Sequence, residues 1–316
     1  MMPSLFCAIV GPTAVGKTEL SLALAEQLHC EILCVDSMQV YRGLDIGAAK
    51  PTAEEQNRVT HYGLDLASPL ENYSASRFAE YAEPILKSYA SRNQPLILCG
   101  GTGLYYRALL EGLFTVPDPD PLLRAHLMQR LQTENAAALY HELRQCDSET
   151  AEKIHPNDGK RLVRALEIIH QTGKTITILK KEQTKKTWID HTCFIGIERD
   201  KNDLSARIEK RTDWMYRNGL LVETRQLLDM GCTTGNTALQ AIGYKECVAH
   251  LQGDLSYKEA VEQTITGTRQ YAKRQMTWFR RQFKTQWINL SKIKDLRETV
   301  RESLQFLSNG GMYISL

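Results

Sequence analysis

Residues 11–18, with the sequence Gly-Pro-Thr-Ala-Val-Gly-Lys-Thr, constrain the fold of this chain more than any other stretch. They match G-x-x-x-x-G-K-[ST], between an apolar run at 5–10 that predicts a buried strand and a helical pattern at 19–29. In this setting, backbone N–H groups and the helix N-terminus attract an anion. Lys17 would reach the outer phosphate, and the Thr18 hydroxyl would bind Mg²⁺. The sequence therefore predicts a site for a di- or triphosphate, whose cradle consists of Gly11, Pro12, Thr13, Ala14, Val15, Gly16, Lys17 and Thr18.

Further apolar runs alternate with helical patterns along the first half of the chain. Strands are predicted at 31–36, 61–66, 95–99 and 193–197, and a helix capped by Ser74 is predicted over 73–90. This alternation is typical of an α/β fold with a parallel sheet flanked by helices. Ligands in such sheets bind at the carboxyl ends of the strands. We therefore expect the phosphate loop, Asp36–Ser37 and Gly100–Gly103 to lie at one edge.

A proline-rich segment, Val116–Pro121, interrupts this pattern and indicates a domain boundary. The helical patterns that follow, from Leu122 to Gln171, include no clear strand. We expect a mostly helical insertion domain at 115–190 within a core domain made of 1–114 and 191–316. The core is expected to be mostly helical again from Leu204 onward.

Composition excludes several classes of protein. No apolar run is long enough for a transmembrane helix, and the N-terminus lacks the basic region of a signal peptide, so we expect a cytoplasmic protein without a membrane partner. The eight cysteines include no C-x-x-C pair, and Cys7, Cys34, Cys99 and Cys193 fall in predicted strands. They are expected to be core thiols rather than zinc ligands or disulfides. The formal net charge of +2 is too small to indicate a partner.

Asp36 ends the second predicted strand. Such an acid can cap a helix, bind Mg²⁺ indirectly, or act as a general base toward a substrate lying across the strand ends. The strand at 95–99 leads into Gly100–Gly103 instead of an acid, which disfavours a nucleotide hydrolase. Thr102 and the glycine amides could donate to a ligand, or could simply form a tight turn.

The segment 264–284 holds six basic residues and no acid. At about 100° per residue, Lys273, Arg280 and Lys284 lie within about 60° of Arg269 on a helix. The adjacent face is apolar: Ile265, Ala272, Met276, Phe279 and Phe283. A charged face is often only solvated, but a stripe of one sign favours binding of a polyanion. Trp278 lies outside the apolar set and could stack on a base.

Other basic residues extend this pattern. Clusters at 160–164 and 174–186 suggest phosphate contacts along an extended ligand. Arg207 and Arg211 share a helix face and could either grip a phosphate or form surface ion pairs.

Seven segments in one order resemble the bacterial tRNA dimethylallyltransferases, also called tRNA isopentenyltransferases. They are residues 11–18, 36–43, 100–105, 155–158, 161–167, 241–246 and 268–280. The resemblance extends over nearly the whole chain, from residue 7 to about 284. The chain departs from the family pattern at Ala48, Tyr62 and Gly159–Lys160. Because of the last departure, the pattern alone does not establish an RNA contact at Lys160.

The resemblance implies transfer of a dimethylallyl group from dimethylallyl diphosphate to N6 of adenosine 37 of tRNA, with Mg²⁺ as cofactor, by a monomeric enzyme. Asp36 would be the base, Lys17, Thr18 and Arg211 would act on the diphosphate, with Arg207 as second choice, and Thr102 would lie at the transfer site. The adenine would have to leave its stack. The residues implied to contact tRNA are Asp36, Ser37, Met38, Gln39, Thr102, Arg124, Lys160, Arg161, Leu162, Val163, Arg164, Arg269, Lys273, Arg280 and Lys284.

Three alternatives remain at this point. An adenylate isopentenyltransferase would share the core motifs, a small-molecule kinase would share the phosphate loop, and a non-catalytic RNA-binding module would share the basic stripe. The sequence does not identify the tRNAs used, the oligomeric state, any motion of the insertion, or whether Asp36 acts as a base or through Mg²⁺.

Overall fold

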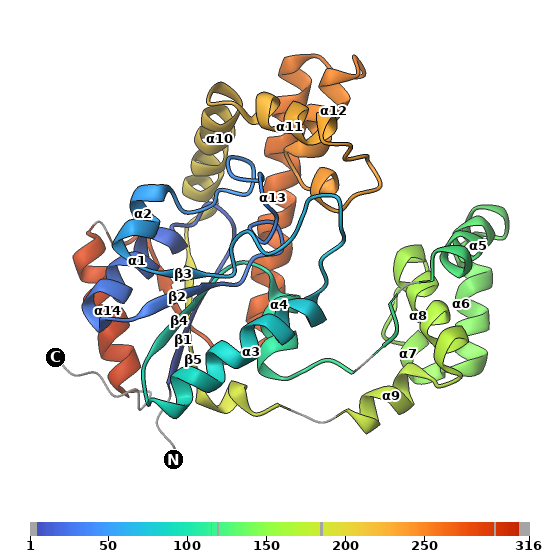
Figure 1. The fold of residues 1–316 in the computed structure, drawn as a ribbon, viewed down its shortest axis with the longest axis horizontal. Helices are drawn as coiled ribbons and strands as arrows, with labels where there is room; N and C mark the ends of the chain where they lie inside the picture. The colour runs from blue at the N-terminus through green and yellow to red at the C-terminus, as the bar shows by residue number, and fades with distance from the viewer. Residues whose placement is uncertain (1–4, 115, 119, 184–185, 294, 310–316) are drawn as a thin grey trace. The chain divides into compact units, whose positions relative to one another are not determined.

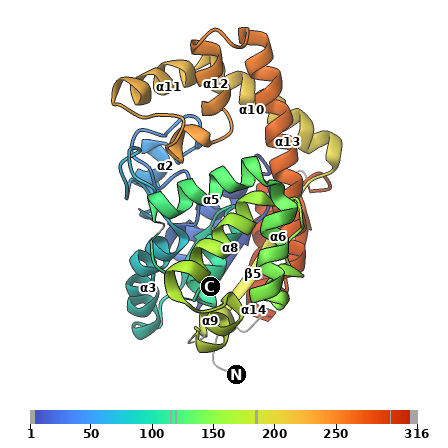
Figure 2. The ribbon, with the colours of Figure 1, turned by 90° about the vertical axis from the view of Figure 1, so that its right-hand side faces the viewer.

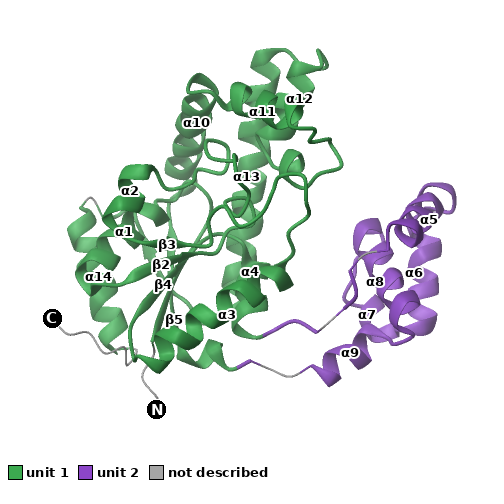
Figure 3. Ribbon diagram, viewed as in Figure 1, with its two compact units in different colours: residues 1–111, 187–316 green, residues 112–186 purple. Residues whose placement is uncertain are grey.

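The chain forms two compact units in a computed structural model that describes residues 5–114, 116–118, 120–183, 186–293 and 295–309. Unit 1 contains residues 1–111 and 187–316, and unit 2 contains residues 112–186 (Figure 3). The division therefore falls at 112 and 186, where the sequence suggested 115 and 190.

Unit 1 is built on a six-stranded sheet with the order β3-β2-β4-β1-β5-β6 (Figure 1). Every neighbouring pair is parallel, as predicted. Strand β6 follows the basic helix and was not predicted, because it has only four residues and two of them are polar. The strands are β1 (Phe6–Val10), β2 (Glu31–Cys34), β3 (His61–Tyr62), β4 (Leu96–Cys99), β5 (Thr192–Glu198) and β6 (Gln286–Asn289).

The sheet is buried between helices, which explains its near-continuous apolar strands. All five residues of β1 are buried. On one face, α1 packs against α14, and elsewhere in unit 1 α3 packs against α4. The Ser74 side chain accepts the Arg77 N–H at 3.2 Å, which confirms the predicted cap of α3. These helices are α1 (Lys17–Leu28), α2 (Ala53–Arg58), α3 (Ala75–Ser91), α4 (Gly103–Leu110) and α14 (Leu296–Asn309).

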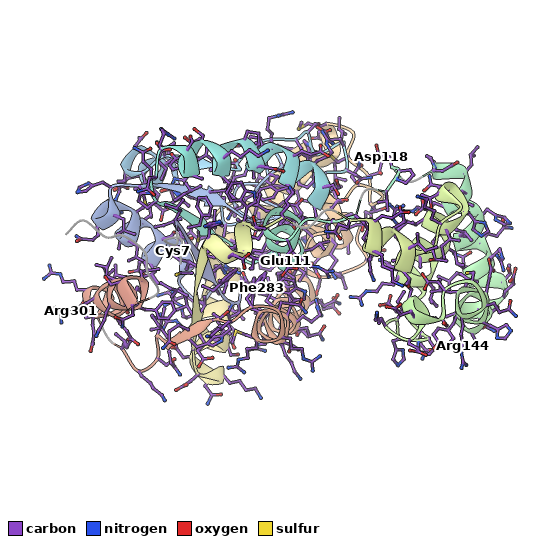
Figure 4. All side chains as sticks on the ribbon, turned by 90° about the horizontal axis from the view of Figure 1, so that it is seen from below. Cys7, Glu111, Asp118, Arg144, Phe283 and Arg301 are labelled. Atoms are coloured by element: carbon purple, nitrogen blue, oxygen red, sulfur yellow. The ribbon has the colours of Figure 1, made fainter. Side chains whose placement is uncertain are left out.

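Cysteines in the strands are part of this core, as expected. Cys7 and Cys34 are buried, and Cys99 and Cys193 are half-buried. In Figure 4, Cys7 lies among the strands, whereas Arg301 projects from α14. All the cysteines are free thiols.

Four further helices of unit 1 gather on one side of it (Figure 1). The longest, α13, packs against α10, α12 and α4. These elements, with two short 3-10 turns, are η1 (Trp188–His191), α10 (Lys201–Arg217), α11 (Leu220–Asp229), η2 (Ala238–Gln240), α12 (Tyr244–Leu251) and α13 (Tyr257–Gln282).

The buried face of α13 differs from the predicted apolar face. It includes the polar residues Thr264, Thr268 and Gln275 beside Ala272 and Phe279, whereas the predicted members Ile265 and Met276 are only half-buried. The buried stripe is therefore rotated toward polar side chains. Hydrophobic periodicity could not identify it.

Trp278, which the sequence suggests could stack on a base, is half-buried and packs within unit 1. Its ring lies 5.1 Å from that of Phe279 and 5.4 Å from that of Phe283, both in edge-to-face geometry. A Cβ on Gly103 would come within 2.3 Å of this indole. Trp278 thus packs α13 onto the start of α4. This contact lies on a different side of α13 from the predicted apolar stripe.

Unit 2 is helical, as the sequence suggested. Helices α5, α6 and α8 pack against one another around a core that includes Leu127, Leu139, Leu162 and Val163 (Figure 2). Its helices are α5 (Pro121–Thr133), α6 (Asn135–Cys146), α7 (Ser148–Ala151), α8 (Gly159–Thr172) and α9 (Ile176–Glu182). Within the described residues, no helix of either unit has the length and apolarity needed to cross a membrane.

Replacing Phe279 with alanine tests the packing of α13. Phe279 is fully buried and contacts Tyr106 edge-to-face at 5.9 Å. The change should lower the free energy of unfolding by about 3–5 kcal/mol, because it removes apolar contacts and leaves a cavity. Val222→Ala, at an exposed position of α11, should change it by less than about 0.5 kcal/mol. Urea unfolding of both variants provides the measurement, and equal shifts would contradict this packing.

Candidate functional site

The phosphate loop joins β1 to α1 and depends on glycine at two positions. Gly11 has φ 150° and Gly16 has φ 112°. A Cβ on Gly11 would lie 2.4 Å from the carbonyl oxygen of Ile197 on β5. The loop can therefore bend closely over the neighbouring strand only with glycine there.

Cations surround this loop on its carbonyl side. Lys17 Nζ donates to the carbonyls of Gly11 (3.1 Å) and Pro12 (2.8 Å). Three arginines continue the series: Arg211 Nη2 donates to Thr13 Oγ1 (2.7 Å), Arg207 Nε to Ala14 O (3.0 Å) and Arg199 Nε to Val15 O (2.9 Å). The charge around the loop is therefore positive, although Asp203 pairs with Arg199 at 2.8 Å. Arg199 was not predicted, although its place directly after β5, at the carboxyl edge of the sheet, was a usable signal.

Two of these cations are poorly solvated. Burial lowers the pKa of Lys17 to about 8 and that of Arg211 to about 10. Asp36 opposes both changes, because its negative charge favours the protonated cations. A bound anion would stabilise the same charges, so the site is electrostatically suited to phosphate.

A pocket of about 530 Å³ opens over the loop. Residues Thr13–Thr18 line one wall, and Asp36 lies in the lining as well. Helix α10 contributes Arg207, Lys210, Arg211 and Trp214. Lys210 and Trp214 were missed by sequence reasoning, although they fall on the helix face that Arg207 and Arg211 define.

A second pocket, of about 330 Å³, adjoins the first. Its lining includes Ser37 and Met38 after β2, Ile242 and Gly243 before α12, and Tyr271 on α13. Four residues contribute to the linings of both pockets: Thr13, Asp36, Ala48 and Arg211. Two molecules that entered from the two pockets would therefore meet at Asp36 and Arg211.

Asp36 is held at this meeting point by the turn that follows β2. Its Oδ1 accepts the Met38 N–H at 2.9 Å. Burial raises the pKa of Asp36 above its usual value, while the N–H groups and the charges of Lys17 and Arg211 act against this rise. A carboxylate with a raised pKa is a stronger base than a solvated aspartate and remains within reach of a ligand in either pocket.

The glycine loop after β4 supports this turn. The Gly100 N–H donates to Ile9 O and the Thr102 N–H to Val35 O, both at 3.3 Å. Thr102 Oγ1 accepts the Ser37 N–H at 3.0 Å. These two amides are therefore occupied within the fold. Thr102 does not belong to the described lining of either pocket. It contacts the turn that holds Asp36 through Ser37.

Gln275 joins the two glycine loops and was missed by sequence reasoning. Its Oε1 accepts the Thr13 N–H and its Nε2 donates to Gly101 O, both at 2.8 Å. The signal was a lone glutamine between Ala272 and Phe279, one helical turn from each. The Gln275 side chain therefore fixes the phosphate loop against the loop that follows β4.

The basic residues of unit 2 divide into two groups. Arg124 and Arg164 form ion pairs of 2.9 and 2.8 Å with Glu167, whose side chain is fully buried. Lys160 and Arg161 are exposed, and Arg161 lies 3.3 Å from Asp158. The prediction for Leu162 and Val163 was wrong for their side chains, which are 0% and 2% exposed in the core of unit 2.

The basic stripe of α13 is partly neutralised by acids on other elements. Arg269 pairs with Glu209 on α10, and Arg280 pairs with Glu198 at 2.6 Å. Lys273 and Lys284 are exposed, and no described residue forms an ion pair with either. The predicted stripe therefore has two available charges and two that are already paired.

The described residues contain no group of three His, Cys, Asp or Glu side chains that could hold a metal ion. Thr18 lies in the lining of the larger pocket beside the phosphate loop. This donor set fits Mg²⁺ that is bound largely by ligand phosphates and water, which is a common mode for this ion.

Comparisons with known proteins place the chain among enzymes of one kind. The family model described as IPP transferase matches residues 39–282. The tRNA dimethylallyltransferase of Halothermothrix orenii is 42% identical over 289 residues, which are 91% of this chain and 88% of that protein. The crystal structure of the full-length tRNA isopentenylpyrophosphate transferase from Bacillus halodurans has a TM-score of 0.70 at 36% identity and covers 97% of this chain and 98% of that one. A eukaryotic dimethylallyltransferase solved acting on tRNA has a TM-score of 0.79 at 28% identity and covers 98% of this chain and 81% of that one.

The lowered pKa of Lys17 predicts proton uptake when the site binds inorganic diphosphate. In the free protein this side chain is charged below pH 8 and increasingly neutral above it. Binding at pH 9 should therefore take up about one proton, because the anion favours the charged form. Calorimetry in buffers of different ionisation enthalpy measures this uptake.

Two variants control for titration of the ligand itself. Lys210→Met removes a positive charge at the pocket rim and retains Lys17, so it should bind more weakly with unchanged uptake. Lys17→Met should lose the uptake. Equal proton uptake by Lys17→Met and Lys210→Met would contradict the assignment.

Proposed function

The chain belongs to the IPP transferase family, and we propose that it transfers a dimethylallyl group from dimethylallyl diphosphate to N6 of adenosine 37 of tRNA. The observation that carries this proposal is the meeting of two pockets at Asp36 and Arg211. One pocket contains the cationic phosphate loop. The other combines apolar side chains such as Met215 and Ile242 with Tyr271 and with polar groups such as Thr268, a mixture suited to a base. The relatives named above support the choice of tRNA over adenylate and over a phosphoryl acceptor.

In the proposed reaction, N6 attacks the allylic carbon as the bond from that carbon to the diphosphate oxygen breaks. The products are N6-dimethylallyladenosine and diphosphate. Adenine N6 is a weak nucleophile, so much of the barrier must be lowered by stabilising the leaving group. Lys17 and Arg211 serve this purpose, since both are desolvated cations that now bind only oxygens of the loop.

Asp36 receives the N6 proton. Burial makes its carboxylate more basic, and the Met38 N–H fixes its orientation toward the reacting centre. Thr18 would hold Mg²⁺ together with oxygens of the diphosphate, and the ion would supply further positive charge to the leaving group. Thr102 supports the Asp36 turn through Ser37.

We infer that the enzyme acts as a monomer in the cytoplasm.

The direct test is incubation of the protein with dimethylallyl diphosphate, Mg²⁺ and unmodified tRNA, followed by mass spectrometry of the nucleosides. N6-dimethylallyladenosine at position 37 is the expected product. Faster prenylation of AMP than of a tRNA anticodon stem-loop would favour an adenylate isopentenyltransferase. Phosphate transfer from labelled ATP without prenyl transfer would establish a kinase.

Asp36→Asn tests the base. The amide has nearly the shape of the carboxylate and can still accept the Met38 N–H, but it cannot take up the N6 proton. We expect single-turnover prenylation to slow by about 10²–10⁴-fold. Binding of tRNA, measured by filter retention, should be retained. A loss of less than tenfold would contradict this role.

The two available lysines of α13 should matter more for tRNA affinity than their paired neighbours. Lys273→Ala or Lys284→Ala should reduce the slope of log affinity against log salt by about one phosphate contact. Arg269→Ala is the matched control, because its charge is compensated by Glu209, and it should change the slope less. Equal changes in all three variants would show that the ion pair does not decide RNA contact.

A further inference from the structure

The carboxylate of Glu223, on α11, binds the loop at residues 45–47. The residue is 8% exposed. Its Oε2 accepts the N–H groups of Asp45 (3.0 Å) and Ile46 (2.9 Å), and its Oε1 accepts that of Gly47 (3.1 Å). The buried Tyr244 hydroxyl donates to Oε1 as well. Four donors therefore converge on a carboxylate that belongs to neither pocket lining.

The loop fixed by Glu223 continues directly into the site. Ala48 lines both pockets, and Ala49 lines the larger one. The carbonyls of these two alanines accept hydrogen bonds from Gln39 Nε2, at 3.3 and 3.0 Å. The position of the Gln39 side chain thus depends on the loop that Glu223 holds.

Gln39 belongs to the turn that holds the catalytic carboxylate. Asp36 Oδ1 accepts the Met38 N–H at 2.9 Å, and the Gln39 N–H acts on the same carboxylate. The hydrogen bonds therefore form a continuous series from α11, through residues 45–49 and Gln39, to Asp36.

We propose that Glu223 is a positioning residue that aligns Asp36 for proton transfer through residues 45–49 and Gln39. The proposal rests on the proposed function, which makes Asp36 the base. Glu223 lines neither pocket, so its effect would be on the chemical step rather than on binding.

The packing of this loop leaves it little freedom to compensate. A Cβ on Gly47 would lie 2.4 Å from the ring of Tyr244, so the loop and the tyrosine are in close contact. A carboxylate only accepts hydrogen bonds. In Glu223→Gln, one amide nitrogen must face N–H donors, so at least one hydrogen bond is lost and the loop must shift.

The test compares Glu223→Gln with Glu31→Gln. Glu31, at the start of β2, accepts the hydroxyls of Tyr62 and Tyr89 in the same unit and lies outside the series. Glu223→Gln should lower kcat about 10–100-fold, as a small misplacement of a catalytic group does. The KM for dimethylallyl diphosphate and the Kd for tRNA should remain unchanged, and Glu31→Gln should leave kcat unchanged.

Two further measurements test the same inference by other means. Amide hydrogen exchange of residues 45–47 should accelerate in Glu223→Gln and not in Glu31→Gln, whatever reaction the protein catalyses. The kcat effects of Glu223→Gln and Gln39→Ala should be less than additive in the double variant, because both changes interrupt one series.

Tyr244→Phe provides a milder variant if Glu223→Gln does not fold. It removes one of the four donors to Glu223, and it should lower kcat several-fold with both substrate affinities retained. Equal kcat for Glu223→Gln and Glu31→Gln, or full additivity with Gln39→Ala, would overturn the proposal. Absence of tRNA prenylation by the wild-type protein would instead overturn the proposed function.

Discussion

The gathering of cations around residues 11–18, which suits the loop to a phosphate chain, is the constraint on which the rest of unit 1 depends. Lys17 and Arg211 lose part of their hydration in the fold, and each is held by oxygens of the loop itself. This arrangement keeps the charges in place before a ligand arrives. A preorganised cationic site is suited to a leaving diphosphate, because little reorganisation is needed as the negative charge develops.

The remainder of unit 1 forms a second pocket beside that charge. The parallel sheet brings the phosphate loop, the turn after β2 and the loop after β4 to one edge, as in other sheets of this type. Helix α13 then joins the two glycine loops through Gln275, and α10 supplies Arg207 and Arg211. The polar residues on the buried face of α13 follow from this task, since they face backbone groups and a pocket rather than an apolar core.

Much of this arrangement was predictable from sequence. The parallel sheet, the phosphate loop and the place of Asp36 at the sheet edge followed from local patterns, whereas the choice of Arg211 followed from the family resemblance. Gln275, Arg199 and Glu223 were missed, because hydrophobic periodicity identifies apolar faces and these are polar groups bound to distant backbone. The side chains of Leu162 and Val163 were wrongly expected at the RNA surface, since α8 turns them into the core of unit 2. The partners of Arg124 and Arg269 lie too far along the chain to be recognised from spacing.

The position of unit 2 within the chain affects how unit 1 can assemble. Strand β5 pairs with β1 only after the chain has passed through residues 112–186 and returned, and α4 and η1, on either side of that excursion, contact each other. Closing a flexible loop costs entropy that grows with its length, by about 0.6 kcal/mol per doubling. An insertion that folds first shortens the flexible chain to be closed. A core of its own, with Leu139 and Leu162 fully buried, is what such early folding of unit 2 would require.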